Sequence, residues 1–419
     1  MTFALFVCYE GWAFVNLINQ WNYIKEVYGG DYQFGHKVGR KLLRWGFSSL
    51  QTNRDDLKGQ MQLLLYAPNL AEVDYDEIIK RLKFYLPHYP ANQIIRCDHL
   101  SREAIFSKTP ILFFGEEAVE NRFLIKYRPS TFNIDFRRNP MDGWEWTNLA
   151  ACFDDEAIHY DEVRLKFTQY IHAIKNEGHS KSYIFGTGPS LEKALGMKWD
   201  DGYRIVCNTI VRDPELWGHL KPHFIVAGDA IYHFGFTSFA RAFRNDLIQR
   251  LKDSDTYFVY PAQFNSIAKN ELAEISDKLI PIPIGWRRRL DGDLCRDFKL
   301  PNLGNVLGLS LLPLASTLSK EVYLWGFDGR APDDRLFWSN SQKHSYPEYM
   351  PELEAAHPKF FDHYVPATDP NKYVKAVQGD ALDGCMKGAE RNGWHYVMMH
   401  PSWTPILQKR YHGVSENGV

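Results

Sequence analysis

The chain has 419 residues, 45% of them hydrophobic and 15% aromatic, so it can bury full cores and exceeds the usual size of one domain. Its 49 basic and 51 acidic side chains nearly cancel, which argues against a broad nucleic-acid surface. The six cysteines are scattered without a CxxC pair, which predicts reduced core residues and suits a cytoplasmic protein. Cysteines and histidines lack zinc-ligand spacing, and no metal is expected.

Neither of the two conspicuous apolar runs predicts a targeting or membrane segment. Phe3–Val7 lacks a basic flank and a small-residue cleavage site, so it does not indicate a signal peptide. Leu303–Ala315 is too short to span a bilayer. Attachment to a membrane surface stays open.

Residues 1–150 alternate apolar runs with helical patterns, which predicts an α/β domain. Tyr75–Leu86 has apolar residues at helical spacing. Arg128–Trp146 is rich in Pro, Asn, Asp, Arg and Trp and is predicted to be a loop. The predicted strands are Phe3–Val7, Gln62–Tyr66, Gln93–Arg96, Ile111–Phe114 and Phe123–Tyr127.

Three carboxylates, Asp154, Asp155 and Glu156, precede a helical pattern at Glu162–Asn176. Such a cluster is most often an N-cap with a solvated first turn. The alternative is a general acid/base at a cleft between domains.

The pattern of residues 151–419 predicts a parallel sheet with helices on both faces. Ligands of such sheets bind beyond the carboxyl ends of the strands. The predicted strands are Tyr183–Phe185, Arg204–Cys207, Phe224–Val226, Tyr257–Tyr260, Lys278–Ile284, Glu321–Trp325 and His395–Met398. The predicted helices are Glu162–Asn176, Pro214–Leu220, Phe239–Asp253, Leu303–Leu318 and Asp380–Asn392.

A glycine turn follows the first of these strands and is the strongest local signal. Its residues are Gly186, Thr187, Gly188, Pro189 and Ser190, and a helix can begin at the next residue. Bare backbone N–H groups at the positive end of a helix suit a phosphate. A plain strand-to-helix turn without a ligand is the alternative.

Polar residues follow other predicted strands as well, and parallel strands should bring them to one rim. These residues are Asn208, Gly228-Asp229, Gly326–Asp328 and His400-Pro401-Ser402. Asn208 can read a ribose or base edge, or cap the next turn. An imidazole and a hydroxyl at His400 and Ser402 can donate to a phosphate.

Asp229 follows a strand and a glycine, so it can project into the cleft as a nucleophile or general base. The alternative is a helix N-cap. His233 can pair with it or pack in the core. Ser238 and Arg244 lie on one predicted helix, where an arginine fork would suit the carboxylate of a substrate.

His363 can act as a general base or a phosphate ligand, or pack without a role. No Walker lysine follows the glycine turn, which disfavours a P-loop nucleotidase. Leu191 occupies the place of the third glycine of GxGxxG.

Six motifs, taken together and in order, resemble bacterial sialyltransferase-like enzymes that use CMP-activated sugars. The resemblance extends from Ser182 to Leu407. The motifs are GTGPSL (Gly186–Leu191), VCNTI (Val206–Ile210), PNLGNVLGLS (Pro301–Ser310), KEVYLWGFD (Lys320–Asp328), FFDHY (Phe360–Tyr364) and MHPS (Met399–Ser402).

This resemblance implies a fold and a nucleotide site. The implied fold is two Rossmann-like domains of the GT-B kind, an acceptor-side domain over 1–150 and a CMP-sugar domain over 151–419, with the active site between them. The glycine turn, Asn208 and the Gly304-Asn305 loop would hold CMP. Their position at strand ends makes Asp328 and His400–Ser402 further candidates for contact with the nucleotide. His363 would be the base or phosphate partner.

Two departures from those sialyltransferases are similar to the retaining β-Kdo transferases that cap lipopolysaccharide O antigens. The chain has about 150 additional N-terminal residues, and it has Asp229 where sialyltransferases tend to have a neutral polar residue. This resemblance implies that Asp229 is the nucleophile and that Glu156, or Asp155 in its place, is the acid/base. Ser238 and Arg244 would meet the sugar carboxylate.

The implied activity is transfer of Kdo from CMP-β-Kdo to a bacterial surface glycan, with retention and without a cofactor. The implied location is the cytoplasm or the inner face of the inner membrane. Three alternatives stay open: an inverting sialyltransferase with His363 as base, a non-catalytic nucleotide- or glycan-binding module of a larger synthase, and a pterin pyrophosphokinase-like protein that shares the GxGPSL loop.

Overall fold

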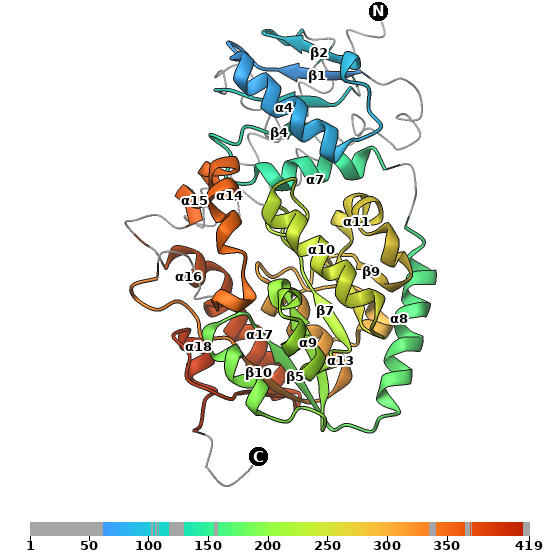
Figure 1. Ribbon diagram of the computed structural model, residues 1–419, viewed down its shortest axis with the longest axis vertical. Helices are drawn as coiled ribbons and strands as arrows, with labels where there is room; N and C mark the ends of the chain where they lie inside the picture. The colour runs from blue at the N-terminus through green and yellow to red at the C-terminus, as the bar shows by residue number, and fades with distance from the viewer. Residues whose placement is uncertain are drawn as a thin grey trace, which may run out of the picture. The chain divides into compact units, whose positions relative to one another are not determined.

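The computed structural model describes residues 62–101, 104, 107, 109–116, 130–154, 158–334, 341–364, 369 and 371–413. The predictions for Phe3–Val7, Phe123–Tyr127, Asp155 and Glu156 lie outside the described residues. The fold is α/β with two parallel sheets, which confirms the predicted class (Figure 1).

The chain divides into two compact units. The first comprises Met1–Ala71 and Pro90–Asn133, and the second comprises Glu72–Tyr89 and Ile134–Val419. Helix α4 (Glu72–Tyr85) therefore belongs to the second unit, although it lies between two strands of the first unit in the sequence.

The first unit contains a four-stranded parallel sheet with the order β2-β1-β3-β4. Its strands are β1 (Leu63–Tyr66), β2 (Ile94–Cys97), β3 (Ile111–Phe113) and β4 (Thr131–Asn133). A small core forms where Tyr66 and Phe113 stack with ring centroids 5.7 Å apart. Strand β4 corrects the predicted loop Arg128–Trp146, because pairing with β3 gives its backbone the partners that its composition does not indicate.

The second unit contains a seven-stranded parallel sheet with the order β11-β10-β5-β6-β7-β8-β9. Its strands are β5 (Lys181–Phe185), β6 (Tyr203–Cys207), β7 (Phe224–Val226), β8 (Tyr257–Pro261), β9 (Leu279–Ile282), β10 (Glu321–Trp325) and β11 (His395–Met398). Within this sheet β5 is the first strand in the sequence. Strands β6, β7, β8 and β9 follow in order on one side of it, and β10 and β11 lie on the other side. The strand order thus reverses between β5 and β10, which is where ligands of open α/β sheets bind.

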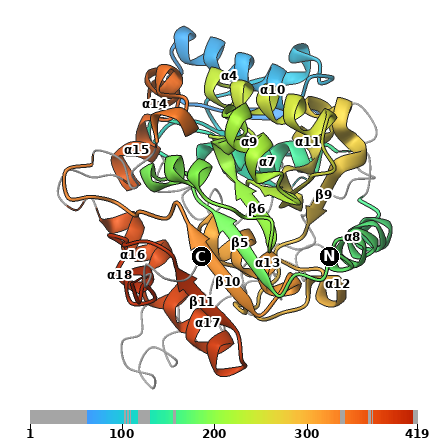
Figure 2. The same cartoon turned by 60° about the horizontal axis from the view of Figure 1, so that its bottom comes forward.

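Helices cover both faces of this sheet (Figure 2). Apolar residues of α8, α12, α13 and α17 join one large core on one face, and α9 and α10 lie on the other face. The helices are α7 (Asp142–Cys152), α8 (Tyr160–Lys175), α9 (Pro214–Leu220), α10 (Ser238–Lys252), α11 (Asn265–Glu271), α12 (Leu294–Asp297), α13 (Leu312–Leu318), α14 (Met350–Ala356), α15 (Pro358–Tyr364), α16 (Lys372–Gln378), α17 (Asp380–Arg391) and α18 (Pro405–Gln408).

Helix α7 is a second correction to the predicted loop Arg128–Trp146. Asp142 and Trp146, which composition assigned to that loop, are both fully buried on this helix. Long-range contacts to Asp142, described below, hold the helix in place despite its unfavourable composition.

Two simpler features of the described residues bear on the predictions. No helix among them combines the length and the apolar character needed to cross a bilayer. Their five cysteines, Cys97, Cys152, Cys207, Cys295 and Cys385, form no disulfide.

Candidate functional site

The carboxyl ends of the seven parallel strands bring the predicted polar residues to one rim, as expected. Asn208 follows β6 and Asp229 lies beyond β7, while the glycine turn follows β5. With strands about 4.8 Å apart, the ends of β5 and β7 are roughly 10 Å apart along the rim.

The loops after β5 and β10 contact each other directly at the point where the strand order reverses. The Gly188 amide donates to the Gly326 carbonyl at 2.8 Å, and Gly326 has φ +78°. A Cβ on Gly326 would lie 2.3 Å from the Gly186 carbonyl oxygen. Glycine is therefore required here by both the backbone angle and the close approach.

The Asp328 carboxylate occupies the donors at the start of the helix that follows the glycine turn. It accepts the Ser190 amide at 3.2 Å and the Ser190 hydroxyl at 2.8 Å. Ser190, predicted to cap the helix or donate to a phosphate, is thus bonded to Asp328 in this arrangement. A phosphate would meet a carboxylate of like charge at this position.

His400 is buried and bonded within the same group of loops. Its Nε2 accepts the Gly326 amide at 2.9 Å and lies 2.9 Å from the Ser190 hydroxyl. Because Nε2 accepts, Nδ1 carries the proton and donates to the Pro401 carbonyl at 2.8 Å. The expectation of an imidazole donor for phosphate is not met here, because His400 joins two loops of the chain.

Ser402 and the Gly304-Asn305 loop also bond within the chain. The Ser402 hydroxyl donates to the Phe327 carbonyl at 2.7 Å. The Asn305 amide donates to the Val377 carbonyl at 2.8 Å, and its Oδ1 accepts the Gly308 amide at 2.9 Å. These side chains hold loops in place, whereas the resemblance assigned them to CMP.

The packing of the glycine turn gives a testable consequence. A Cβ on Gly188 would lie 2.1 Å from Asp328 Oδ2 and 2.8 Å from the Gly326 carbonyl oxygen. We expect Gly188→Ala to lower the free energy of unfolding by about 1–3 kcal/mol, measured by urea titration. Gly196→Ala is the control, because a Cβ there meets nothing within 4 Å. Equal stability of the two variants would contradict the described packing.

Asn208 differs from the preceding residues because its side chain is not fully bonded. Its backbone is left-handed, with φ +51°, a conformation that asparagine tolerates better than most residues. Its Oδ1 atom is buried and has no hydrogen-bond partner among the described residues. A buried unpaired acceptor at the rim is a candidate contact for a ligand donor.

Asp229 is held by one carboxylate oxygen. Its Oδ1 accepts the amides of Ile231 and Tyr232, both at 2.9 Å, as an N-cap does. No described residue bonds Oδ2, and the side chain is partly exposed. The protein packed around it raises the pKa of Asp229 to about 6, against the effect of the two amides. The carboxylate is therefore poised for chemistry near neutral pH.

The residues predicted to bind a substrate carboxylate have other partners. The buried Arg244 guanidinium pairs with Glu271 at 2.9 Å and donates to the carbonyls of His233 and Gly235. It therefore fixes the loop that begins at Asp229. The Ser238 amide donates to Glu352 at 3.2 Å. The guanidinium of Arg244 is therefore engaged within the chain, whereas the contact of Ser238 involves its backbone amide and does not bear on the role predicted for its hydroxyl.

His233 is a packed histidine and not a partner of the Asp229 side chain. Its ring lies edge-on to Phe243, with centroids 4.6 Å apart. Burial, and then the nearby charge of Arg244, lower the pKa of His233 to about 3. The ring therefore stays neutral at physiological pH.

Helix α15, which carries His363, packs against the loop that begins at Asp229. The Tyr232 ring, in the loop after β7, lies 6.4 Å from the rings of Phe360 and Phe361 on this helix. His363 is half-buried, and burial followed by the charges of nearby lysines lowers its pKa. Of the acid/base candidates, Asp154 is buried and ion-paired with Lys269.

A buried charge cluster near the same loop was not predicted. Asp142 accepts the Arg81 guanidinium at 2.8 Å and contacts His357 Nδ1 at 2.8 Å. All three side chains are at most 1% exposed, and His357 Nε2 has no partner among the described residues. The available signal was Arg81 itself, since it lies among the apolar positions of the predicted helix Tyr75–Leu86.

Tyr85 and Trp146 extend this polar region towards Asp229. Their rings stack 5.5 Å apart, and neither Tyr85 Oη nor Trp146 Nε1 has a partner in the described part of the chain. Burial raises the pKa of Tyr85, and the charges of Asp142 and Asp229 add to that rise. Asp229 thus lies close to side chains that still have unused hydrogen-bonding capacity.

The fold and the rim together define a Rossmann-like α/β protein with a perturbed carboxylate beyond a central strand of its sheet. No group of three or more His, Cys, Asp or Glu side chains suited to a metal occurs among the described residues. Comparison of the chain with protein-family models, with curated proteins and with solved structures gave no match.

Proposed function

We propose that the protein is a retaining glycosyltransferase that moves Kdo from CMP-β-Kdo to a glycan acceptor. The observation that supports this most is Asp229, a partly exposed carboxylate with a pKa raised to about 6. One oxygen is fixed by two amides and the other has no described partner. The choice of a CMP-activated sugar as donor rests on the ordered set of motifs that resemble CMP-sugar transferases.

Asp229 Oδ2 would attack the anomeric carbon of Kdo in the first step. The bond from that carbon to the CMP oxygen breaks, and CMP leaves with the electron pair. In the second step an acceptor hydroxyl attacks the same carbon and releases Asp229, while a base takes the hydroxyl proton. Two inversions give net retention, as in retaining glycosidases. Glu156 is the proposed base by resemblance.

The cytidylate would lie beside Asn208, whose unpaired Oδ1 can accept a hydroxyl or amino donor. Phosphate binding at the glycine turn would require the Asp328 carboxylate to release Ser190. The Ser190 amide and hydroxyl would then become available to the phosphate. Calorimetry with CMP tests this part, and Asp328→Asn should bind CMP more tightly than wild type because a like charge is removed.

The pKa of Asp229 predicts the pH dependence of transfer. A nucleophilic carboxylate must be ionised, so kcat/KM should fall tenfold per pH unit below about 6. A profile that stays flat down to pH 4.5 would contradict the assignment, because an ordinary aspartate has a pKa of 3.8.

The raised pKa of Asp229 also makes the free energy of unfolding depend on pH. Because the pKa of Asp229 is higher in the folded state than in the unfolded chain, ionisation costs stability as pH rises from about 4 to 7. Asp229→Asn lacks this cost, so its free energy of unfolding relative to wild type should rise by about 1–3 kcal/mol over that window.

An inverting sialyltransferase with His363 as base is the second candidate. It is favoured by the position of α15 against the Asp229 loop and by the lowered pKa of His363, which keeps the ring neutral. The anomeric configuration of the product, read by NMR, separates the two candidates. Retention supports Asp229 as nucleophile, and inversion supports His363.

A further inference from the structure

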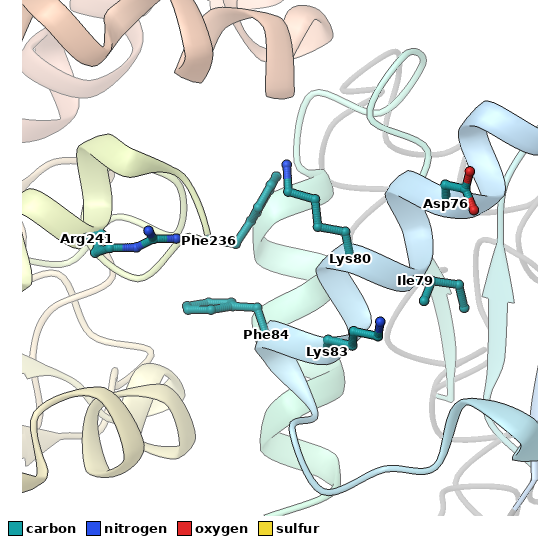
Figure 3. Close-up of a pocket in the computed structure, with 7 residues that line it drawn as sticks. All are labelled: Asp76, Ile79, Lys80, Lys83, Phe84, Phe236 and Arg241. Carbon is teal, nitrogen blue, oxygen red and sulfur yellow. The ribbon is translucent and has the colours of Figure 1, made fainter.

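A hollow of about 460 Å³ lies in the second unit (Figure 3). It is lined by Lys80, Lys83 and Phe84 of α4, and by Phe236 and Arg241 at the start of α10. Figure 3 shows Lys80 and Phe84 reaching from one wall towards Phe236 and Arg241 on the other.

The cations of this hollow outnumber its carboxylates. Asp76 is the one acidic side chain among its lining residues. The Lys80 amine lies 3.7 Å from Glu77, which also pairs with Arg81, and no ion pair joins Lys83 or Arg241 to another described residue. Like charges that face one hollow repel each other, so an anion placed between them would be stabilised.

A further cation lies beneath the hollow. The Arg244 guanidinium is 5.2 Å from the centroid of the Phe84 ring. Burial lowers the pKa of Arg244, Glu271 opposes that shift, and the charge of Arg241 adds to it. Arg241 is exposed and lies about one helical turn before Arg244 on α10.

The phenyl rings define the kind of anion that would fit. Phe84 is half-buried and Phe236 is 6% exposed, so together they give the hollow an apolar wall. Lys80 already lies 5.2 Å from the centroid of Phe236. Apolar walls with a few convergent polar groups suit organic ligands, whereas a bare inorganic anion would gain nothing from the rings.

The hollow and Asp229 adjoin the same part of the structure. Phe84 precedes Tyr85, whose pKa responds to the charge of Asp229. Phe236 ends the loop that Asp229 begins, and Arg244 bonds that loop from within. Phe236 thus links the lining of the hollow to the loop that carries the candidate nucleophile.

We propose that this hollow binds an anionic saccharide, with the phosphate or carboxylate between Lys80 and Arg241 and the sugar against Phe84 and Phe236. Its assignment as the acceptor's anchoring site rests on the proposed function. The binding itself does not depend on transfer, so the two are tested separately.

Calorimetry with glucose 1-phosphate, inorganic phosphate and glucose as probes tests this inference on the full chain. We expect glucose 1-phosphate to bind more tightly than either of the other two probes. Lys80→Glu combined with Arg241→Glu should weaken it at least tenfold, and the corresponding glutamine pair should weaken it less. Arg164→Glu is the matched control, because Arg164 is an exposed cation on α8.

Equal binding of inorganic phosphate and glucose 1-phosphate would overturn the inference, as would an equal loss in Arg164→Glu. Binding to vesicles of phosphatidylcholine with phosphatidylglycerol, without binding of glucose 1-phosphate, would also overturn it in favour of a membrane surface. Asp229→Ala should bind the probe like wild type. A wild-type protein that binds the probe but shows no transfer counts against the proposed function, and one that transfers Kdo but does not bind the probe counts against this site.

Discussion

Asp229→Ala is expected to lower the turnover of Kdo transfer by a factor on the order of 10³ or more, because it removes the attacking group. Asp229→Asn should lose as much, although its Oδ1 can still accept the amides of Ile231 and Tyr232. The asparagine variant therefore separates loss of the nucleophile from loss of the loop. CMP release in the presence of CMP-Kdo and acceptor is the measurement.

Asp200→Ala provides the control for this experiment, since Asp200 is an exposed carboxylate of the same unit. Its turnover should equal that of wild type. Near wild-type turnover of Asp229→Ala would rule out a double displacement through this residue and would leave His363 as the candidate base.

Asp142→Ala is expected to lower the free energy of unfolding by about 3–5 kcal/mol, because it leaves Arg81 as a buried charge without its main partner. His357 Nδ1 loses its partner in the same step. A urea titration followed by tryptophan fluorescence measures this change. The expected size is large because both Asp142 and Arg81 are at most 1% exposed.

The exposed pair of Asp161 and Arg164, 3.4 Å apart on α8, is the comparison. Asp161→Ala should change stability by no more than about 0.5 kcal/mol, because water solvates the remaining charge. A loss of less than about 1 kcal/mol in Asp142→Ala would mean that water solvates Arg81 in the variant. It would contradict a stabilising role of this cluster between α4, α7 and α14.

The alternation of apolar runs and helical patterns was enough to predict the sheet of the second unit. Parallel strands with both faces covered are almost purely apolar, as in Phe224–Val226, and such runs are easy to recognise. Helix α9 was predicted with its observed bounds, because Asp213 caps it and Pro214 begins it. Local signals therefore decided these elements.

Helix α7 could not be predicted in the same way. Its sequence has a low apolar periodicity, and its place depends on Arg81, which is 61 positions away in the chain. Strand β4 likewise gains its identity from pairing with β3. Where partners distant in sequence decide the structure, composition alone is misleading.

The sequence was enough to predict where the candidate site residues lie, but not which hydrogen-bond partners they have. Strand ends gave the rim, and with it the positions of Asn208 and Asp229. The glycine turn suggested free amides, yet the Gly188 amide donates to the Gly326 carbonyl and the Ser190 amide to Asp328, 138 positions away. Whether a donor group is free depends on the tertiary partners of each atom, and no pattern of residue types contains that information.

Incubation of the protein with CMP-Kdo in the absence of acceptor, followed by intact-protein and peptide mass spectrometry, tests the central claim most directly. We predict a mass increase of one Kdo residue, located on the peptide that contains Asp229 and absent in Asp229→Asn. Active transfer to an acceptor with an inverted product and no adduct would contradict it.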